Sequence, residues 1–185
     1  MSKRASAPGN RIGRRSSPAA ERVSADLRLG QGGALRRRRR VAAMALSSAG
    51  SMGVVAAYQM GLIKHLPEPR LAVLDADKVD ASGEAYQYLK TPDAALGLAN
   101  SAITLVLAGM GPARRAEERP WIPVALAAKV GLDTVSALYL TVEQGSKHRR
   151  FCSWCLLAAA LSAAMVPQVL PEARTAWDQI RGRKS

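Results

Sequence analysis

The two cysteines of this chain, Cys152 and Cys155, stand three residues apart at the start of an apolar stretch. On a helix this spacing puts both side chains on one face, so the two sulfurs can meet. A helix N-terminus carries partial positive charge, and Lys147, Arg149 and Arg150 precede the pair. Both features favour the thiolate, the reactive form of cysteine. The pair is therefore a candidate for reversible thiol–disulfide chemistry.

Other interpretations of the cysteines stay open. Free cysteine is often buried and inert, so one alternative is that both are small packing residues. A metal site would have only His148, Cys152 and Cys155 as ligands, with no fourth residue of the usual type nearby, and we expect no metal. The pair is not a haem attachment motif, because Leu156 rather than histidine follows Cys155.

Lys129 and Asp133 are charged residues within another apolar stretch. They are four apart, so on a helix they share a face and can form an ion pair. Lys129 would lie about 12 Å into a bilayer by helical rise, where an unpaired charge costs at least about 2.5 kcal/mol. We expect the pair to face the interior of a helix bundle. It is either a proton path or polar wall of a binding pocket, or a clamp between helices.

The elements that must position these residues are long and apolar. Each stretch is long enough to cross about 30 Å of hydrocarbon as a helix, and helices that are apolar on all faces are rare in soluble proteins. The sequence predicts an all-α, integral membrane four-helix bundle within residues 41–172. The predicted helices cover about residues 41–63, 94–111, 121–142 and 151–170.

Both ends of the chain are basic. Residues 1–40 hold 12 Lys and Arg against Glu21 and Asp26, and they have no aromatic residue. Such a segment buries too little surface to offset its ordering entropy, so we expect a disordered basic cytoplasmic tail. Residues 173–185 are expected to form a second one. The arginine run at 36–40 fixes topology and attracts lipid headgroups, and since no folded readout module is visible we expect no nucleic-acid binding.

The flanking charges predict a multi-pass protein of the cell inner (plasma) membrane with both termini cytoplasmic. The loop at 65–93 is acidic and is expected outside. The loop "EQGSKHRR" before the cysteines is basic. Three predicted crossings separate it from the cytoplasmic N-terminus, so it must also lie outside. This arrangement puts the cysteines at the outer face, where disulfide chemistry is permitted.

A C-x-x-C that opens the fourth of four membrane helices resembles the vitamin K epoxide reductase family, including its bacterial members. Three stretches carry the resemblance. "FCSWCLLAAALSAAMVPQVLPEA" is similar to the fourth helix of that family, and "TPDAALGLANSAITLVLAG" is similar to its second helix. "GVVAAYQMGLIKHLPEPRLAVLDADKVDASGEAYQYL" resembles the end of its first helix and its outer loop. The resemblance covers roughly residues 41–172 and leaves out both tails.

The resemblance implies a membrane thiol–quinone oxidoreductase. Cys152 and Cys155 would be the redox pair, with Cys155 facing a quinone of the ubiquinone or menaquinone type. Asp93 stands where the family usually has an asparagine that hydrogen-bonds the quinone carbonyl, and a carboxylate donates such a bond only when protonated. Together with Lys129 and Asp133, Asp93 is a candidate for the quinone pocket.

One departure from the family concerns the electron supply. The family normally has a second cysteine pair in the first outer loop, whereas here the loop "LDADKVDASGEAYQYLK" contains no cysteine. Thiol–disulfide exchange needs an attacking thiolate, so no relay exists within this chain. We therefore expect a thioredoxin-like or other cysteine-bearing extracytoplasmic partner. The alternative is a non-catalytic membrane scaffold or assembly subunit that retains the bundle.

Overall fold

A computed structural model describes residues 17–86 and 90–182, and this part of the chain is helical with no strand beyond one isolated bridge. The long helices are α2 (Gly33–Gln59), α4 (Asp93–Gly109), α6 (Trp121–Glu143) and α7 (Ser153–Ile180). The short elements are α1 (Pro18–Leu29), α3 (Ala76–Asp80), α5 (Arg115–Glu118), the 3-10 turn η1 (Gly83–Tyr86) and the π-helical turn η2 (Gln144–His148). The all-α class is therefore confirmed.

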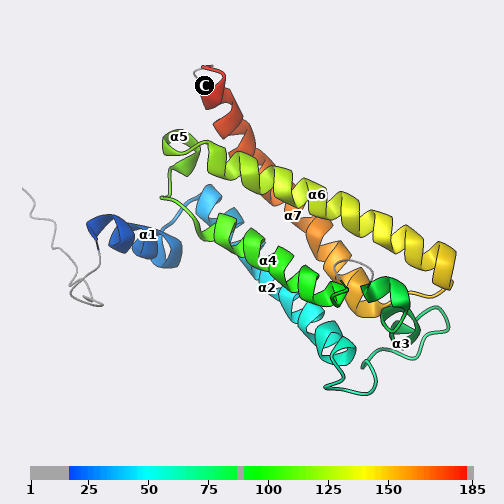
Figure 1. Ribbon diagram of the computed structural model, residues 1–185. Coiled ribbons are helices and arrows are strands. Elements are labelled where there is room, and N and C mark those ends of the chain that lie inside the picture. Colours follow the sequence, from blue (N-terminus) through cyan, green and yellow to red (C-terminus); the bar gives the residue numbers. More distant parts are fainter. Residues whose placement is uncertain (1–16, 87–89, 183–185) are drawn as a thin grey trace, which may run out of the picture.

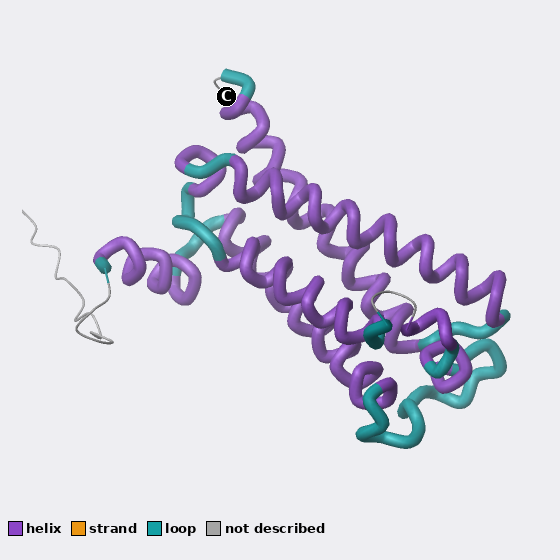
Figure 2. Tube along the Cα trace, viewed as in Figure 1, coloured by secondary structure: helices purple, strands orange, loops and turns teal. Residues whose placement is uncertain are grey.

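The four long helices lie along one another (Figures 1 and 2). α2 packs against α4 and α7, and α6 packs against α7 and α4. One end of the bundle carries α1, α5 and the C-terminal end of α7, and we call it the arginine end. The other end carries α3 and the loop before α7, and we call it the cysteine end. Both ends of the described chain thus lie at the arginine end.

Among the described residues, three helices are long and apolar enough to cross a membrane: α2 with 27 residues, α6 together with η2 with 28, and α7 with 28. α4 is apolar but has only 17 residues, about 25 Å of helix. Three of the four predicted spans are therefore matched by helices of the necessary length. The crossing by α4 stays a prediction, and so does the complete four-helix membrane bundle.

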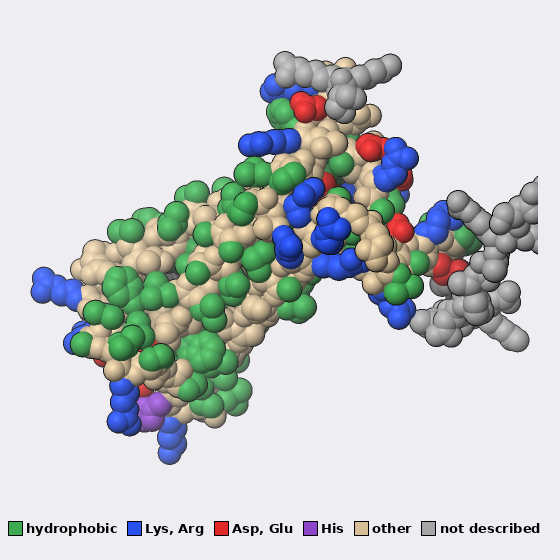
Figure 3. All heavy atoms as spheres, turned by 180° about the vertical axis from the view of Figure 1, so that it is seen from behind, with side chains coloured by type: hydrophobic (Ala, Val, Ile, Leu, Met, Phe, Trp, Pro, Cys, Tyr) green, Lys and Arg blue, Asp and Glu red, His purple; other side chains and the backbone are tan. Residues whose placement is uncertain are grey.

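The outer surface of the bundle is apolar. On α6, Leu132, Val135, Leu138 and Val142 are all more than half exposed. Figure 3 shows hydrophobic side chains spread over the long helices, with Lys and Arg gathered toward the two ends. An apolar surface of this extent indicates contact with lipid, because soluble monomers rarely expose one so large.

Arg38, within the arginine run, lies inside the protein and caps α4. Only 3% of Arg38 is exposed. Its guanidinium donates to the carbonyl oxygens of Ala108 (3.0 Å) and Pro112 (3.1 Å), and also to those of residues 109–111. The last carbonyls of a helix have no hydrogen-bond partner within it, and they carry partial negative charge. A cation here therefore supplies the missing donors and balances the charge.

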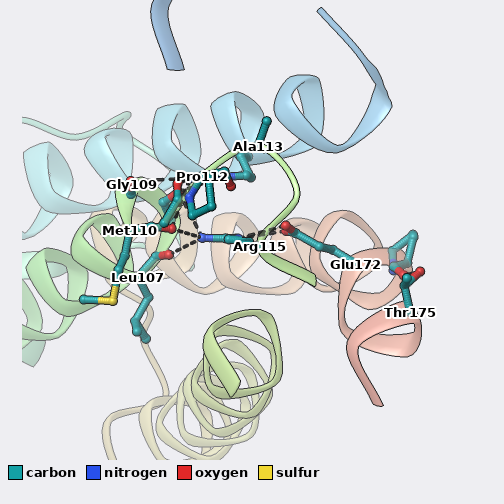
Figure 4. A network of polar contacts seen from close by, with 12 residues as sticks. Leu107, Gly109, Met110, Pro112, Ala113, Arg115, Glu172 and Thr175 are labelled. Carbon is teal, nitrogen blue, oxygen red and sulfur yellow. Dashed lines mark hydrogen bonds and ion pairs between the residues drawn. The ribbon is translucent and has the colours of Figure 1, made fainter. Parts of the chain in front are cut away.

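Arg115 completes this cap from the other side (Figure 4). It is fully buried, and it donates to the carbonyls of Leu107 (2.6 Å) and Met110 (2.9 Å). Its Nε and Nη2 atoms also meet the two carboxylate oxygens of Glu172 on α7, at 2.8 and 2.9 Å. We call Arg38, Arg115, Glu172 and the carbonyls of residues 107–112 the arginine cap. It joins α2, α4, α5 and α7.

The expected tails differ from the structure. Residues 18–29 form α1, whose start is capped by the Ser17 hydroxyl, and residues 33–40 are the first turns of α2. The prediction of disorder is therefore wrong for these residues, because Arg38 and Arg39 find buried or partly buried carbonyl acceptors that composition does not reveal. At the other end, α7 continues through 173–180. Residues 1–16 and 183–185 lie outside the described residues.

Candidate redox site

The two cysteines lie at the start of α7, as the sequence predicts. Cys152 is the N-cap residue of the helix, and its sulfur accepts a hydrogen bond from the backbone N–H of Cys155 at 3.2 Å. Both cysteines are free thiols. A sulfur at an N-cap takes the place of the usual hydroxyl or carboxylate, and it lies where the helix dipole favours negative charge.

The turn that carries the cysteines is joined to the outer loop through the backbone. Phe151 N–H donates to the carbonyl of Val73, and Asp75 N–H donates to the carbonyl of Phe151, both at 3.0 Å. These bonds form a short parallel bridge between Leu74 and Phe151. The segment just before α3 is therefore fixed against the residue that precedes Cys152.

Side chains hold the same turn from two sides. Gln144 Oε1 accepts from Cys152 N–H (3.1 Å), which satisfies a donor at the helix start. Glu68 Oε2 accepts from the hydroxyl of Ser153 (3.1 Å), while Glu68 Oε1 accepts from Ala76 N–H (2.5 Å). Glu68 thus links the start of α7 to the start of α3.

Asp80 is the side chain that contacts the thiols. It is the last residue of α3 and only 2% exposed. The Cys155 sulfur lies 3.6 Å from Asp80 Oδ1, and the two sulfurs and a carboxylate oxygen all lie within 4.8 Å of one another. Asp80 Oδ2 is buried and has no hydrogen-bond partner among residues 17–86 and 90–182. An unpaired buried carboxylate oxygen is energetically costly. Protonation of Asp80, or contact with a cation, would therefore stabilise this cluster.

Two carboxylates contact the turn that carries the cysteines. In the structure Asp80 and Glu68 hydrogen-bond to this turn, and Lys147 forms an ion pair with a residue of α6. The stabilisation of a thiolate by Lys147, Arg149 and Arg150 stays a prediction. The surroundings favour thiols, or thiolates neutralised by a cation.

Burial raises the pKa of Asp80 to about 6, and the nearby charges of Asp93 and Glu68 add to this, whereas hydrogen bonds from Cys152 and Cys155 oppose it. The folded-state pKa thus lies above the unfolded value of about 3.9. The stabilisation is complete below about pH 4 and is lost as pH rises through about 6.

We expect the wild-type chain to lose on the order of 2 kcal/mol of stability over this pH range because Asp80 ionises. The Asp80→Asn variant should not show this loss. The difference in melting temperature between the two proteins, measured in detergent with a chelator present from pH 4 to 7, checks this. Glu118→Gln, which alters an exposed carboxylate of α5 at the other end of the bundle, is the control. Parallel pH profiles for wild type and Asp80→Asn would contradict it.

The two cysteines differ in exposure in a way that the sequence does not indicate. Cys152 is fully buried against α2 and α3, among Val55, Ala76 and Val79, whereas Cys155 is partly exposed. Cys155 is one turn deeper along α7, yet it is the more exposed residue of the two. An external thiol reaches Cys152 only when the outer loop moves.

Asp93 lies at the cysteine end, next to this cluster. It is the first residue of α4, and its Oδ1 atom accepts from Gln59 Nε2 at 2.7 Å. Gln59 also donates to the backbone carbonyl of Asp80 (3.3 Å) and accepts from Ala94 N–H (3.2 Å). The structure thus brings Asp93 near the cysteine pair through one glutamine.

Lys129 and Asp133 form the expected ion pair, with Nζ and Oδ2 2.5 Å apart and both side chains largely buried. Lys129 also donates to the carbonyl of Asn100 and the hydroxyl of Thr104, each at 3.2 Å, so it faces α4 inside the bundle. Asn100 is seven residues along α4 from Asp93, about 10 Å by helical rise. The pair therefore contacts a deeper level of α4 than Asp93 does.

Sequence reasoning missed Asp80 and Glu68 as site residues. Asp80 appears in the sequence as one of several acids in an acidic loop, and nothing local separates it from Asp75 or Asp77. Its contact with Cys155 joins positions 75 residues apart. The one available signal was its place near the end of "LDADKVDAS", the loop that lacks the expected cysteines.

These features define a helical membrane protein with a C-x-x-C pair beside a buried carboxylate at one end of its bundle. The sequence profile of the vitamin K epoxide reductase family matches residues 39–170, and the chain belongs to that family. No curated protein and no solved structure matches the chain.

Proposed function

We propose that this chain is a membrane thiol–quinone oxidoreductase in which Cys152 and Cys155 cycle between dithiol and disulfide. The observation that carries the proposal is the placement of both free sulfurs against Asp80 at the start of a membrane-length helix. Membership of the vitamin K epoxide reductase family supports the same reaction class. The quinone would be of the ubiquinone or menaquinone type.

In the reaction, the dithiol gives two electrons and two protons to the quinone, which leaves as quinol, and a bond forms between the sulfurs. Asp80, 3.6 Å from the Cys155 sulfur, is placed to accept one thiol proton. Two electrons return when an external dithiol attacks the disulfide, passes through a mixed disulfide with Cys152, and becomes oxidised itself. The balance is one partner dithiol oxidised for each quinone reduced.

The electron donor would be a thioredoxin-like or other cysteine-bearing extracytoplasmic partner, because the outer loop has no cysteine of its own. We place the protein in the cell inner (plasma) membrane with both termini in the cytoplasm. The arginine end then faces the cytoplasm and the cysteine end faces the oxidising side. Four crossings, with α4 included, are needed for this arrangement.

Thiol trapping in membranes tests the proposal. Membranes that contain the full-length chain are incubated with and without added quinone, then denatured and treated with a maleimide polymer that adds visible mass to each free thiol, the buried Cys152 included. We expect two modified cysteines under reducing conditions and none after quinone is added. Thiols that stay reduced with quinone would overturn the redox function and favour the alternative, a scaffold or assembly subunit that the missing loop cysteines also suggest.

We expect Asp93→Asn to improve quinone binding. An ionised carboxylate only accepts hydrogen bonds, whereas an amide also donates to a quinone carbonyl, and one added bond is worth about a tenfold change in KM. Gln59 can keep its contact with the amide oxygen. Steady-state quinone reduction measures KM and kcat separately. An unchanged or raised KM would remove Asp93 from the quinone pocket.

Lys129 and Asp133 remain candidates for the same pocket. The contacts of Lys129 with α4 equally suit a clamp between helices. Asp133→Asn separates the two roles, because a clamp changes stability alone whereas a pocket wall also changes the quinone KM. A groove between α6 and α7, next to Arg174 and Trp177 at the arginine end, is lined by none of these residues.

A further inference from the structure

Asp80, Cys152 and Cys155 together offer three possible metal ligands. Three ligand atoms, two sulfurs and one carboxylate oxygen, lie within 4.8 Å of one another. They come from separate elements, the end of α3 and the start of α7.

We propose that the reduced site binds a thiophilic divalent cation of the Zn²⁺ class through the sulfurs of Cys152 and Cys155 and the carboxylate of Asp80. A fourth, open position would be filled by water or another exchangeable ligand. The third protein ligand is thus Asp80, which the sequence did not indicate, rather than His148.

The distances fit such a site. Zn–S bonds of about 2.3 Å and Zn–O bonds of about 2.0 Å in a tetrahedron place neighbouring ligand atoms about 3.5 Å apart. The Cys155 sulfur and Asp80 Oδ1 are 3.6 Å apart. The sulfurs need only small side-chain rotations to reach the same spacing, because all three atoms already lie within 4.8 Å.

The surroundings also call for a cation. Asp80 Oδ2 is buried without a hydrogen-bond partner in a side chain that is 2% exposed. Glu68 contacts the same turn, and the charge of Asp93 acts on Asp80. A carboxylate that lacks a partner in a low-dielectric site is satisfied by metal coordination, as buried charges generally are.

Cation binding and disulfide formation exclude each other. Binding displaces one proton from each thiol and leaves two metal–thiolate bonds. When an oxidant removes two electrons from the sulfurs, the S–S bond forms, both metal–sulfur bonds break and the cation leaves. The site therefore holds the cation only in the dithiol state.

Cobalt binding by the full-length chain in detergent tests this inference. The protein is reduced, freed of metal with a chelator and titrated with Co²⁺, whose thiolate charge-transfer absorption reports sulfur ligation, and Zn²⁺ is then added as a competitor. We expect one Co²⁺ per chain and displacement by Zn²⁺. The absence of a thiolate band in the reduced wild type would overturn the inference.

Two variants separate ligation from charge. Asp93→Asn removes a nearby negative charge but no ligand, and Asp80→Asn removes both. We expect Asp80→Asn to bind at least about tenfold more weakly than Asp93→Asn, since loss of a ligand exceeds loss of a surrounding group. Equal affinities would show that Asp80 is not a ligand. Circular dichroism establishes that each variant is folded.

Oxidation with diamide, which takes two electrons and two protons from the dithiol, provides a second measurement. We expect one Zn²⁺ to be released for each disulfide formed, followed with a chromogenic chelator. Zn²⁺ that stays bound after oxidation would overturn the assignment of the cysteines as ligands. Neither readout depends on quinone, so failure of the cation site and failure of the oxidoreductase function are distinguishable.

Discussion

Replacing Cys155 with serine is expected to abolish thiol-driven quinone reduction and to let Cys152 be trapped in a mixed disulfide with the oxidised partner. Without the second sulfur no internal disulfide can form, so no electrons pass to a quinone. The Cys152 thiolate can still attack a disulfide of the oxidised partner, which breaks that S–S bond, forms the mixed disulfide and frees one partner thiol. Turnover should fall by about a thousandfold or more, the scale seen when a group that forms a covalent intermediate is removed. Quinone reduction in membranes measures the loss, and a non-reducing gel shows the adduct.

Cys152→Ser is the matched variant, because it also stops turnover but removes the sulfur that we assign to the partner. We expect no adduct from it. Cys152→Ser can keep the helix start, since a serine hydroxyl is a good N-cap acceptor, and Cys155→Ser leaves the Cys152 cap in place. An adduct from Cys152→Ser and none from Cys155→Ser would reverse the assigned roles, a result that the greater exposure of Cys155 makes worth examining.

Breaking the buried ion pair between Arg115 and Glu172 is expected to have the largest effect on stability. Arg115 is 0% exposed and Glu172 is only 8% exposed. Glu172→Leu therefore leaves a buried guanidinium without its anion. Loss of one partner of such a pair costs about 3–5 kcal/mol. Unfolding in detergent, followed by circular dichroism against denaturant, measures the change.

Two comparisons make this prediction specific. Arg114 pairs with Glu117 on the surface, and Glu117→Leu should cost less than about 1 kcal/mol. The double variant Arg115→Met with Glu172→Leu removes both charges and should recover part of the loss, although the carbonyls of α4 then lack donors. A Glu172→Leu cost no greater than that of Glu117→Leu would show that the pair does not stabilise the fold.

The parts of the fold that the sequence predicts well are those set by hydropathy. The stretches at 94–111 and 121–142 correspond to α4 and α6 within two residues at each end, because an apolar run ends where polar loop residues begin. The first helix was placed at 41–63, but α2 runs from Gly33 to Gln59. Charged arginines were excluded from the helix, although α2 includes them and Arg38 finds its acceptors in α4.

The site was predicted only as far as local spacing allows. The pair of cysteines on one helix face and the ion pair between Lys129 and Asp133 depend on three- and four-residue spacing, and the structure has both. The contact of Asp80 with Cys155 depends on how a loop folds back over α7, which no local pattern contains. Long-range contacts made by polar loops could therefore not be predicted from the sequence.

The short length of α4 has a consequence for the surrounding lipid. At about 25 Å it falls below the hydrophobic thickness of an ordinary bilayer, while α2 at 27 residues exceeds it. The arginine cap satisfies the carbonyls at the C-terminal end of α4. In the predicted membrane bundle, the polar connection from α4 to α5 therefore lies deeper in the bilayer than the ends of the neighbouring helices. With the predicted crossing by α4, hydrophobic mismatch on that side favours a locally thinned membrane. The stability of this protein should accordingly depend on acyl-chain length.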